Sequence, residues 1–256
     1  MITNKEIQNV VGGLRGFLGK KKAVLGLSGG IDSSVVGCLA AQAISSWDVY
    51  GIMMPYGDQS VSDSLEVARF LKINPVIVDI KPEVDSKMAK IMSAGYDIVG
   101  HMGDNARSLV LGNLKARERM SILYAFAGCL GGFVLGTSNK TELMIGYLTK
   151  HGDGACDIEV IGDFFKGEVY ELARTFGHFP PKVYDKPPSA ELWDGQTDEE
   201  EIGITYHHLD NLLKEILVQG IDDYKDDVPG DDGKVIRMVR ESAHKRNPAP
   251  VIKRGE

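Results

Sequence analysis

Residues 26–34 read Gly26-Leu27-Ser28-Gly29-Gly30-Ile31-Asp32-Ser33-Ser34 and directly follow the apolar run Ala-Val-Leu at 23–25. An apolar strand, a Gly-rich turn and a helical pattern, in this order, predict an anion site. Unpaired N–H groups at a helix N-terminus point outward, and the helix dipole adds positive charge there. Glycines at 29 and 30 let the backbone approach a phosphate closely and take φ values that other residues avoid. Asp32 would be out of place in a pure anion site, so it indicates a Mg²⁺ ion that bridges carboxylate and phosphate.

The spacing excludes two common phosphate loops. A Walker A loop requires a Lys after its second Gly, and this turn contains no Lys. A dinucleotide-binding fingerprint requires Gly-x-Gly-x-x-Gly, and Ser28 stands where one of those glycines is needed. The structural alternative is an ordinary Gly-rich turn capped by Asp or Ser.

The composition is that of a globular protein. The 256 residues are 43% hydrophobic and 25% charged, and the net charge of −7 disfavours a nucleic-acid partner. No apolar run approaches the roughly 20 residues of a membrane span, and the N-terminus lacks a signal-peptide pattern, so we expect a cytoplasmic protein with no membrane contact. Three scattered cysteines argue against disulfides and zinc. Cys38 and Cys129 lie in apolar helical patterns and are expected in the core.

Strand-like and helix-like patterns alternate along the first half of the chain. Strands are predicted at 23–27, 49–53, 76–80 and 133–135, and helices at 3–18, 32–44, 60–71, 83–92 and 105–128. This alternation predicts an α/β fold: an open parallel sheet flanked by helices on both faces. Ligands of such sheets bind at the carboxyl ends of the strands. The Ser28 loop and the segments 54–56 and 136–139 should therefore rim one crevice.

The pattern changes after residue 149. Residues 151–163 are rich in Gly and Asp, and 179–196 carry four prolines, so both are predicted as loops. Helices are expected at 166–176, 205–217 and 234–246, with a capping box at 197–200. We expect a single domain spanning 1–256, with substrate lids at about 149–163 and 179–196.

Several motifs carry a family resemblance. The Ser-Gly-Gly-x-Asp-Ser loop is similar to that of the ATP pyrophosphatases. The stretches 113–120, 136–142, 146–153, 186–192 and 244–246 resemble the ammonia-dependent NAD synthetases, in order and in approximate spacing. The resemblance covers the chain almost end to end and implies a Rossmann-like fold of the adenine-nucleotide alpha-hydrolase type.

The resemblance implies an ATP-dependent amidation. Deamido-NAD (nicotinate adenine dinucleotide) would form an acyl-adenylate with ATP, and ammonia would convert it to NAD, with release of AMP and diphosphate. Relatives that use glutamine carry an additional nitrilase-like domain, for which the motifs of this chain leave no room. Free ammonia is therefore the expected nitrogen donor. The family also binds its dinucleotide at a homodimer interface, and the apolar pattern of helix 105–128 is compatible with such a contact.

The resemblance also assigns roles to residues. Expected ATP contacts are Gly26, Leu27, Ser28, Gly29, Gly30, Ile31, Asp32, Ser33, Thr137, Lys166 and Ser189. Expected deamido-NAD contacts are Arg117, Lys150, Asp157, His244 and Lys245. Asp32 and Glu142 are the expected Mg²⁺ ligands, since carboxylate oxygens suit that ion. Asp153 is the expected catalytic group, which holds ammonium and accepts its proton.

Each role has a structural alternative. Glu142 could complete a helix cap at Asn139, and Lys166 could be a solvated surface lysine. Ser189 and Asp153 could be turn residues, and Arg117 could lie on a solvated helix face. His244-Lys245-Arg246 could be a basic helix end that favours the dipole.

Two other functions remain open at this point. One is a related pyrophosphatase that acts on a tRNA base or a purine nucleotide, although a tRNA enzyme should be basic and this chain is acidic. The other is a non-catalytic module that senses ATP, which would not need Glu142 and Asp153 beside the phosphate loop.

Overall fold

The computed structural model describes residues 2–95, 103–177, 179–189, 192–193, 195–224 and 228–254. The segment predicted as a loop at 179–196 lies partly outside the described residues, at 190, 191 and 194. Within the described ranges, no helix has the length and apolar character needed to cross a membrane.

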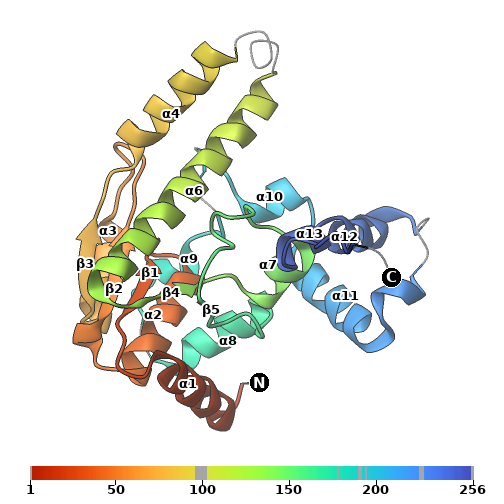
Figure 1. Cartoon of the computed structure of the whole chain (residues 1–256). Coiled ribbons are helices and arrows are strands. Elements are labelled where there is room, and N and C mark those ends of the chain that lie inside the picture. Colours follow the sequence, from red (N-terminus) through yellow and green to blue (C-terminus); the bar gives the residue numbers. More distant parts are fainter. Residues whose placement is uncertain are drawn as a thin grey trace.

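A five-stranded parallel sheet forms the centre of the fold (Figure 1). Its strands are β1 (Ala23–Gly26), β2 (Val49–Met53), β3 (Asn74–Ile77), β4 (Phe133–Gly136) and β5 (Ile158–Glu159), in the order β3-β2-β1-β4-β5. The chain builds outward from β1 to β3 and then returns to the other side of β1. The strand order therefore reverses between β1 and β4, which is where open α/β sheets bind ligands.

Helices cover both faces of the sheet, as the alternation predicted. Helices α1 (Asn4–Leu18), α2 (Ile31–Ala43), α3 (Ser62–Leu71) and α8 (Lys166–Thr175) build the main core with Ala23 and Leu25 of β1. Helix α6 (Asp104–Leu130) packs on the opposite face, against Val24 of the same strand. These three strand residues have no accessible surface, because a parallel strand covered on both faces is apolar throughout.

The C-terminal helices form a second core beside the sheet. They are α7 (Lys140–Ile145), α10 (Asp198–Ile202), α11 (Tyr206–Gln219), α12 (Gly230–Glu241) and α13 (Ala243–Arg246). Leu209 and Leu213 of α11 pack there against Val235 and Ile236 of α12. Figure 1 shows this group of helices to the right of the sheet, so the two cores meet along α7 and α8.

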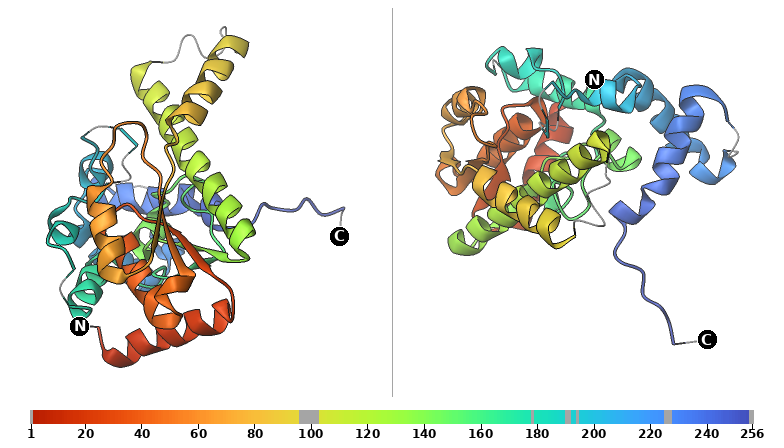
Figure 2. Two further views of the ribbon diagram at one scale, coloured as in Figure 1. Left: turned by 90° about the vertical axis from the view of Figure 1, so that its left-hand side faces the viewer. Right: turned by 90° about the horizontal axis from the view of Figure 1, so that it is seen from above.

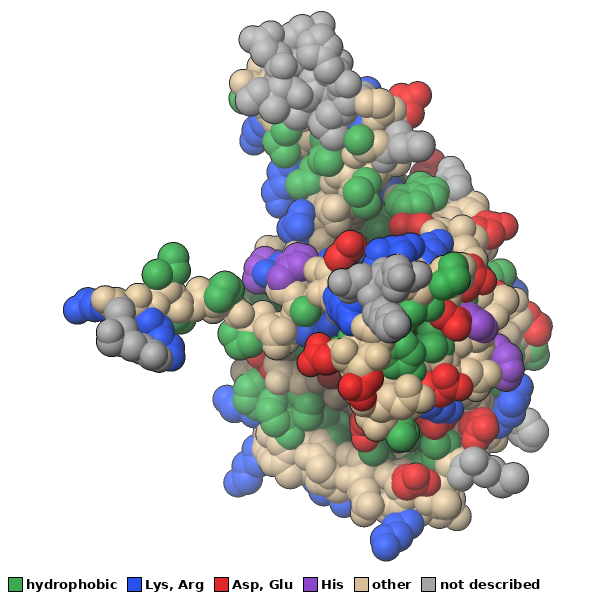
Figure 3. All heavy atoms as spheres, turned by 90° about the vertical axis from the view of Figure 1, so that its right-hand side faces the viewer, with side chains coloured by type: hydrophobic (Ala, Val, Ile, Leu, Met, Phe, Trp, Pro, Cys, Tyr) green, Lys and Arg blue, Asp and Glu red, His purple; other side chains and the backbone are tan. Residues whose placement is uncertain are grey.

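Two projections leave this body. Helices α4 (Lys81–Ala94) and α6 form a long hairpin, with an ion pair between Lys87 and Glu118, and residues 247–254 extend away from α13 (Figure 2). Both projections are visible in Figure 3, where acidic and basic side chains are interspersed over the face toward the viewer.

Several expectations need correction. Strand β5 lies in the segment predicted as a loop at 151–163, and the short helix α9 (Lys182–Asp185) lies in that predicted at 179–196. Strand β3 spans Asn74–Ile77 rather than the predicted 76–80. The helix predicted at 234–246 is two helices, because the chain breaks at Ser242, which packs against Gly146. Cys129 is exposed, so its placement in the core was wrong, whereas Cys38 is buried.

Candidate active site

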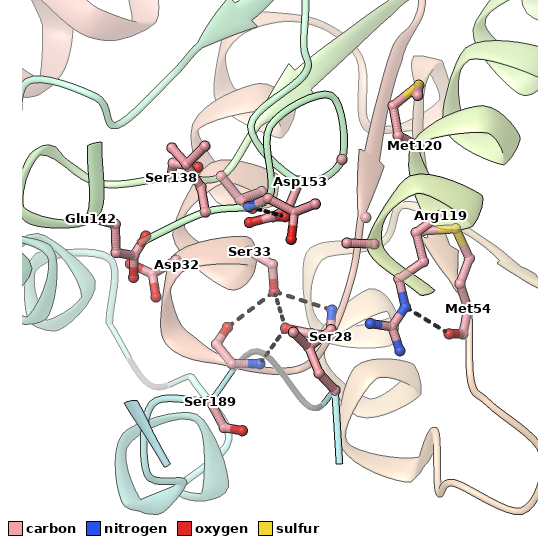
Figure 4. A pocket seen from close by; sticks show the side chains of 18 of the residues that line it. Ser28, Asp32, Ser33, Met54, Arg119, Met120, Ser138, Glu142, Asp153 and Ser189 are labelled. Atoms are coloured by element: carbon pink, nitrogen blue, oxygen red, sulfur yellow. Dashed lines mark hydrogen bonds between the residues drawn. The ribbon is translucent and has the colours of Figure 1, made fainter. Parts of the chain in front are cut away.

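One cavity of about 710 Å³ lies at the carboxyl ends of the strands (Figure 4). The Ser28 loop, Met54-Pro55 and Thr137-Ser138 all line it, so the segments expected to rim one crevice do so. Helix α6 and the segment 186–189 close its sides. All the predicted site residues line this cavity except Gly29 and Asp157.

The Gly-rich loop is held in shape by its own serines. The Ser33 hydroxyl accepts from the Ser28 N–H at 3.3 Å and donates to the Gly30 carbonyl at 3.2 Å. The Ser28 hydroxyl lies 3.1 Å from that of Ser33. These bonds fix the turn before α2, whose first residues Ile31, Asp32 and Ser33 line the cavity. The strand, loop and helix predicted from residues 23–34 are confirmed.

The two glycines of the loop have different tasks. Gly29 has a φ of +77°, and a Cβ there would lie 2.8 Å from the Ser64 backbone nitrogen at the start of α3. Gly30 has a φ of −76° and faces the cavity as the N-cap of α2. The expectation that both glycines take φ values that other residues avoid is therefore confirmed at Gly29 and wrong at Gly30. Gly29 allows the loop to pack closely against the start of α3, and Gly30 leaves space on the side of the loop that lines the cavity.

A buried lysine joins the two predicted metal ligands. Lys166 Nζ donates to Asp32 Oδ2 at 2.5 Å and to Glu142 Oε1 at 3.3 Å. Only 2% of the lysine side chain is accessible, so it is not the solvated surface lysine of the alternative interpretation. The three residues come from α2, α7 and α8 and form one charged cluster on the cavity wall.

Asn139 sets the separation of the two carboxylates. Asn139 Nδ2 donates to Asp32 Oδ1 at 3.0 Å, and the side-chain oxygen Oδ1 of Asn139 accepts from the Glu142 N–H at 3.0 Å. The Glu142 carboxylate in turn accepts from the Asn139 N–H at 3.1 Å, which completes a capping box. The helix-cap interpretation of Glu142 is therefore confirmed. The cap uses Oε2 of Glu142, so Oε1 of the same carboxylate remains able to accept from Lys166 Nζ.

The charges of this cluster stabilise one another against burial. Burial opposes the charge on the Lys166 amine, but Asp32 and Glu142 raise the pKa of that amine overall, so the ammonium is retained. Burial raises the pKa of Glu142, and repulsion from Asp32 adds to this, while Lys166 acts in the opposite direction. Charge on Glu142 thus depends on a nearby cation.

The cluster offers a partial site for a hard cation. Asp32 and Glu142 present carboxylate oxygens toward one position, which an ammonium takes up here, and Mg²⁺ prefers such ligands. Across the described residues, no three His, Cys, Asp or Glu side chains converge to enclose a metal by themselves. The set therefore fits an ion that completes its shell with phosphate oxygens and water.

Asp198 and Tyr206 were missed from the sequence. The Tyr206 hydroxyl lies 2.9 Å from Asp198 Oδ2 and 3.3 Å from Glu142 Oε1, and Lys166 Nζ lies 4.9 Å from the centre of the tyrosine ring. Asp198 is 4% exposed and lines the cavity. The sequence signal was the cap at Thr197, which places Asp198 in the first turn of α10.

Asp153 lies apart from Asp32 and Glu142, on the far side of the cavity from the Ser28 loop (Figure 4). Its carboxylate accepts from the Thr149 N–H at 2.9 Å. The residue keeps accessible surface toward the cavity, yet desolvation by the surrounding wall raises the pKa of its carboxyl group. The turn interpretation is thus correct for its backbone contact, and the raised pKa suits proton transfer.

The predicted dinucleotide contacts are only partly assembled. Arg117 Nε donates to the Lys150 carbonyl at 3.3 Å, and His244 lines the same part of the cavity. Lys245 Nζ donates to the carbonyls of Gly146 and Leu148, at 2.7 and 2.9 Å.

Asp157 faces away from these residues. Its carboxylate accepts from the Val134 N–H at 2.7 Å and lies 3.5 Å from the Tyr124 hydroxyl, so it supports β4.

The segment after Lys186 is fastened to α6. Lys115 Nζ donates to the Leu192 carbonyl at 2.6 Å, and the Leu192 side chain covers Gly112, where a Cβ would lie 3.2 Å from it. The Lys186 ammonium donates to the Ser28 carbonyl at 3.2 Å. Ser189 is thereby held at the lower side of the cavity, facing the Ser28 loop (Figure 4).

Comparison with known proteins agrees with this geometry. The family model described as NAD synthase matches residues 5–249. An NH(3)-dependent NAD(+) synthetase from Methanococcoides burtonii is 40% identical over 235 residues, which cover 89% of this chain and 86% of that protein.

Two solved structures resemble the whole chain. The NMN synthetase from Francisella tularensis has a TM-score of 0.82 and 32% identity, and the alignment covers 98% of this chain and 99% of that one. The NH3-dependent NAD synthetase from Campylobacter jejuni, in complex with the nitrate ion, has a TM-score of 0.77 and 25% identity, with 99% and 100% covered. On the fold, the site and these matches, this chain belongs to the NAD synthase family.

Proposed function

We propose that this protein amidates deamido-NAD with free ammonia at the expense of ATP, giving NAD, AMP and diphosphate. The observation that carries the proposal is that the Ser28 loop, the cluster of Asp32, Glu142 and Lys166, and Asp153 all line one cavity. The names of the relatives support the same activity.

In the first step, a nicotinate carboxylate oxygen would bond to the α-phosphorus of ATP. The bond from that phosphorus to the bridging oxygen breaks, and diphosphate leaves. The N–H groups that begin α2 and the Lys166 ammonium would hold the phosphates, with Thr137 and Ser189 as further ATP contacts. Asp32 and Glu142 would hold Mg²⁺, which when bound neutralises phosphate charge.

In the second step, ammonia would attack the carbonyl carbon of the acyl-adenylate, and AMP leaves with the electron pair of the broken C–O bond. One proton must be removed from the new nitrogen. Asp153 is the group we assign to accept it, because its carboxylate faces the cavity and its raised pKa makes it a better base than an ordinary aspartate.

The reactive mixed anhydride requires protection from water. We assign this role to the segments 149–163 and 179–196, whose described parts line the cavity at Thr149, Asp153 and Ser189. Limited proteolysis with and without ATP and deamido-NAD tests the assignment, since closure should slow cleavage in both segments. Equal cleavage rates in the two conditions would contradict it.

A homodimer and a cytoplasmic location are part of the proposal. Leu123, Phe126 and Leu130 of α6 are partly buried against the sheet, whereas Leu109 and Tyr124 are 53% and 36% exposed. These exposed apolar groups support a contact between two copies along α6. Light scattering at micromolar concentration should give twice the mass of 27.9 kDa. ATP and free ammonia as substrates fit the cytoplasm.

The similarity to the NMN synthetase from Francisella tularensis supports a second candidate substrate, nicotinate mononucleotide, in place of deamido-NAD. The test is diphosphate release from ATP and Mg²⁺ with either acid, with ammonium or glutamine as nitrogen donor, or with tRNA. We expect release only with deamido-NAD and ammonium, with NAD as product. Preference for the mononucleotide would change the substrate, a response to tRNA would indicate the related pyrophosphatase, and ATP binding without turnover would indicate a sensor.

A further inference from the structure

Asp198 carries a buried carboxylate oxygen whose partner is missing from the protein. Its Oδ2 accepts from the Tyr206 hydroxyl at 2.9 Å, whereas Oδ1 is inaccessible to solvent and accepts no hydrogen bond of normal geometry. The Tyr147 hydroxyl also interacts with Asp198, but its proton is donated to Glu201 Oε2 at 2.7 Å.

Leaving such a group unsatisfied costs about 1–3 kcal/mol, so each case calls for an explanation. Among the described residues, Glu159 Oε2 and the Tyr224 hydroxyl share this property, and of the three residues only Asp198 lines the cavity. The residue is 4% exposed and lines the cavity, so the explanation is sought there.

A purely structural role accounts for only half of this carboxylate. Asp198 is the first residue of α10, where an acidic side chain favours the helix dipole, and its Oδ2 anchors Tyr206. An asparagine could also accept the hydrogen bond from the Tyr206 hydroxyl, without a buried charge. The charge and the unpaired Oδ1 therefore need a further cause.

The charge balance of the site points to a cation. Lys166 is the positive group among the carboxylates of Asp32, Glu142 and Asp198, and the charge of Asp198 acts on both Lys166 and Glu142. A single ammonium is thus shared among three buried carboxyl groups, and burial raises the pKa of both Glu142 and Asp198 because it opposes their charge. The Tyr206 hydroxyl reaches both Glu142 and Asp198, so Asp198 lies next to the predicted metal ligands.

Direct coordination by all three carboxylates does not fit the geometry, since no such trio converges among the described side chains. Mg²⁺ in nucleotide sites is bound through one or two carboxylates and the phosphates, and it keeps several waters. A carboxylate one shell further out would accept a hydrogen bond from such a water.

We propose that Asp198 is a positioning residue of the cation site. Once Lys166 has turned away from the carboxylates on nucleotide binding, Asp198 Oδ1 accepts a hydrogen bond from a water on the Mg²⁺ held by Asp32 and Glu142. This rests on the proposed function, which supplies the ion together with ATP. Partners in this outer position change metal affinity about 10- to 100-fold when they are removed.

The test is direct Mn²⁺ binding, measured by electron paramagnetic resonance of the free ion, to the full-length protein with a non-hydrolysable ATP analogue. Asp198→Asn keeps an oxygen for Tyr206 and removes the charge. We expect its Kd for Mn²⁺ to rise about 10- to 100-fold. The Mg²⁺ concentration for half-maximal NAD formation should rise in parallel, and excess Mg²⁺ should restore the rate.

Glu201→Gln is the matched control, because Glu201 lies on the same helix and lines the same cavity. Its Oε2 is already paired with Tyr147 and Gln196, both at 2.7 Å, so we expect unchanged Mn²⁺ affinity. An equal loss in both variants would show a general charge effect and overturn the proposal. An unchanged Kd in Asp198→Asn, with or without a lower melting temperature, would overturn it too, as would absence of Mn²⁺ binding to the wild type.

The readout separates this proposal from the proposed function. Mn²⁺ binding to the protein with the ATP analogue does not require turnover of deamido-NAD. A protein whose Mn²⁺ affinity depends on Asp198 but which forms no NAD would refute the proposed activity alone. A protein that forms NAD with an Mn²⁺ affinity indifferent to Asp198 would refute the positioning role alone.

Discussion

Replacing Gly29 by alanine should damage the fold more than replacing its neighbour Gly30. At Gly29 the φ of +77° is one that L-residues with a Cβ rarely adopt, and the αL region costs such a residue about 1–2 kcal/mol. The added Cβ would also lie 2.8 Å from the Ser64 nitrogen and 3.1 Å from the Asp63 carbonyl carbon. Both are backbone atoms, so no side-chain rotation relieves the overlap.

The two costs add at the same residue. We expect Gly29→Ala to lower the free energy of unfolding by about 2–4 kcal/mol, in the range of overpacked and strained backbone sites. At Gly30 the φ is −76°, and a Cβ would meet only the Ser28 hydroxyl, at 3.3 Å. Alanine there also reduces the entropy of the unfolded chain, which offsets small losses. We therefore expect Gly30→Ala to stay within about 0.5 kcal/mol of the wild type.

In a binding assay the order of the two variants should be reversed, with Gly30→Ala losing more ATP affinity than Gly29→Ala. A methyl group at Gly30 projects on the cavity side of the loop, where a phosphate would approach, so its ATP affinity should fall about tenfold or more. Urea unfolding and calorimetric titration with an ATP analogue measure the two quantities. A Gly29→Ala protein as stable as the wild type, or a Gly30→Ala protein with unchanged affinity, would refute this division of tasks.

Three further outcomes follow from buried or exposed groups. Asn139→Ala should lower the free energy of unfolding by about 2–3 kcal/mol in urea titrations, since it removes a helix cap and the amide bonded to Asp32. Burial raises the pKa of Glu159 to about 7 from 4.5, so its contribution to stability is complete below pH 4.5 and is lost as pH rises through 7. For the wild type we therefore expect the free energy of unfolding to fall between pH 5 and pH 8, by at most about 3 kcal/mol from this group. Glu159→Gln should remove that part of the pH dependence. Mass spectrometry after a bulky thiol reagent should find Cys129 labelled in the folded protein and Cys38 labelled only after unfolding, because the latter is buried.

Local patterns predicted the fold well because its decisive element is local. The strand, turn and helix around the Ser28 loop are adjacent in sequence, and hydrophobic runs define the strands beside it. Strand β5 escaped prediction because it has two residues and is a strand only through its pairing with Leu135 and Gly136. Cys129 was misplaced because α6 is apolar on the face toward the sheet, and this residue lies on the other face.

The candidate site was predictable as a set of residue types but not as an arrangement. The burial of Lys166 depends on Asp32, which is 134 positions away in the sequence. Asp198 looked like the first-turn acid of an isolated short helix, and only the tertiary structure brings it beside Tyr206 and Glu142. Residue type and helix position can be read locally, whereas charge balance exists only after the helices have met.

Lys166 should be the member of the cluster that moves when nucleotide binds. Asp32, Glu142 and Asp198 all lie in the first turns of their helices, where the dipole favours a negative charge. Lys166 is the first residue of α8, so the dipole of its own helix opposes its positive charge, and the carboxylates, together with the Tyr206 ring, hold it there. A divalent cation that takes over those carboxylates removes the attraction, and a phosphate nearby offers a new partner. A structure with Mg²⁺ and an ATP analogue should show Nζ turned to a phosphate oxygen, and Nζ still bonded to both carboxylates beside the bound ion would contradict this reasoning.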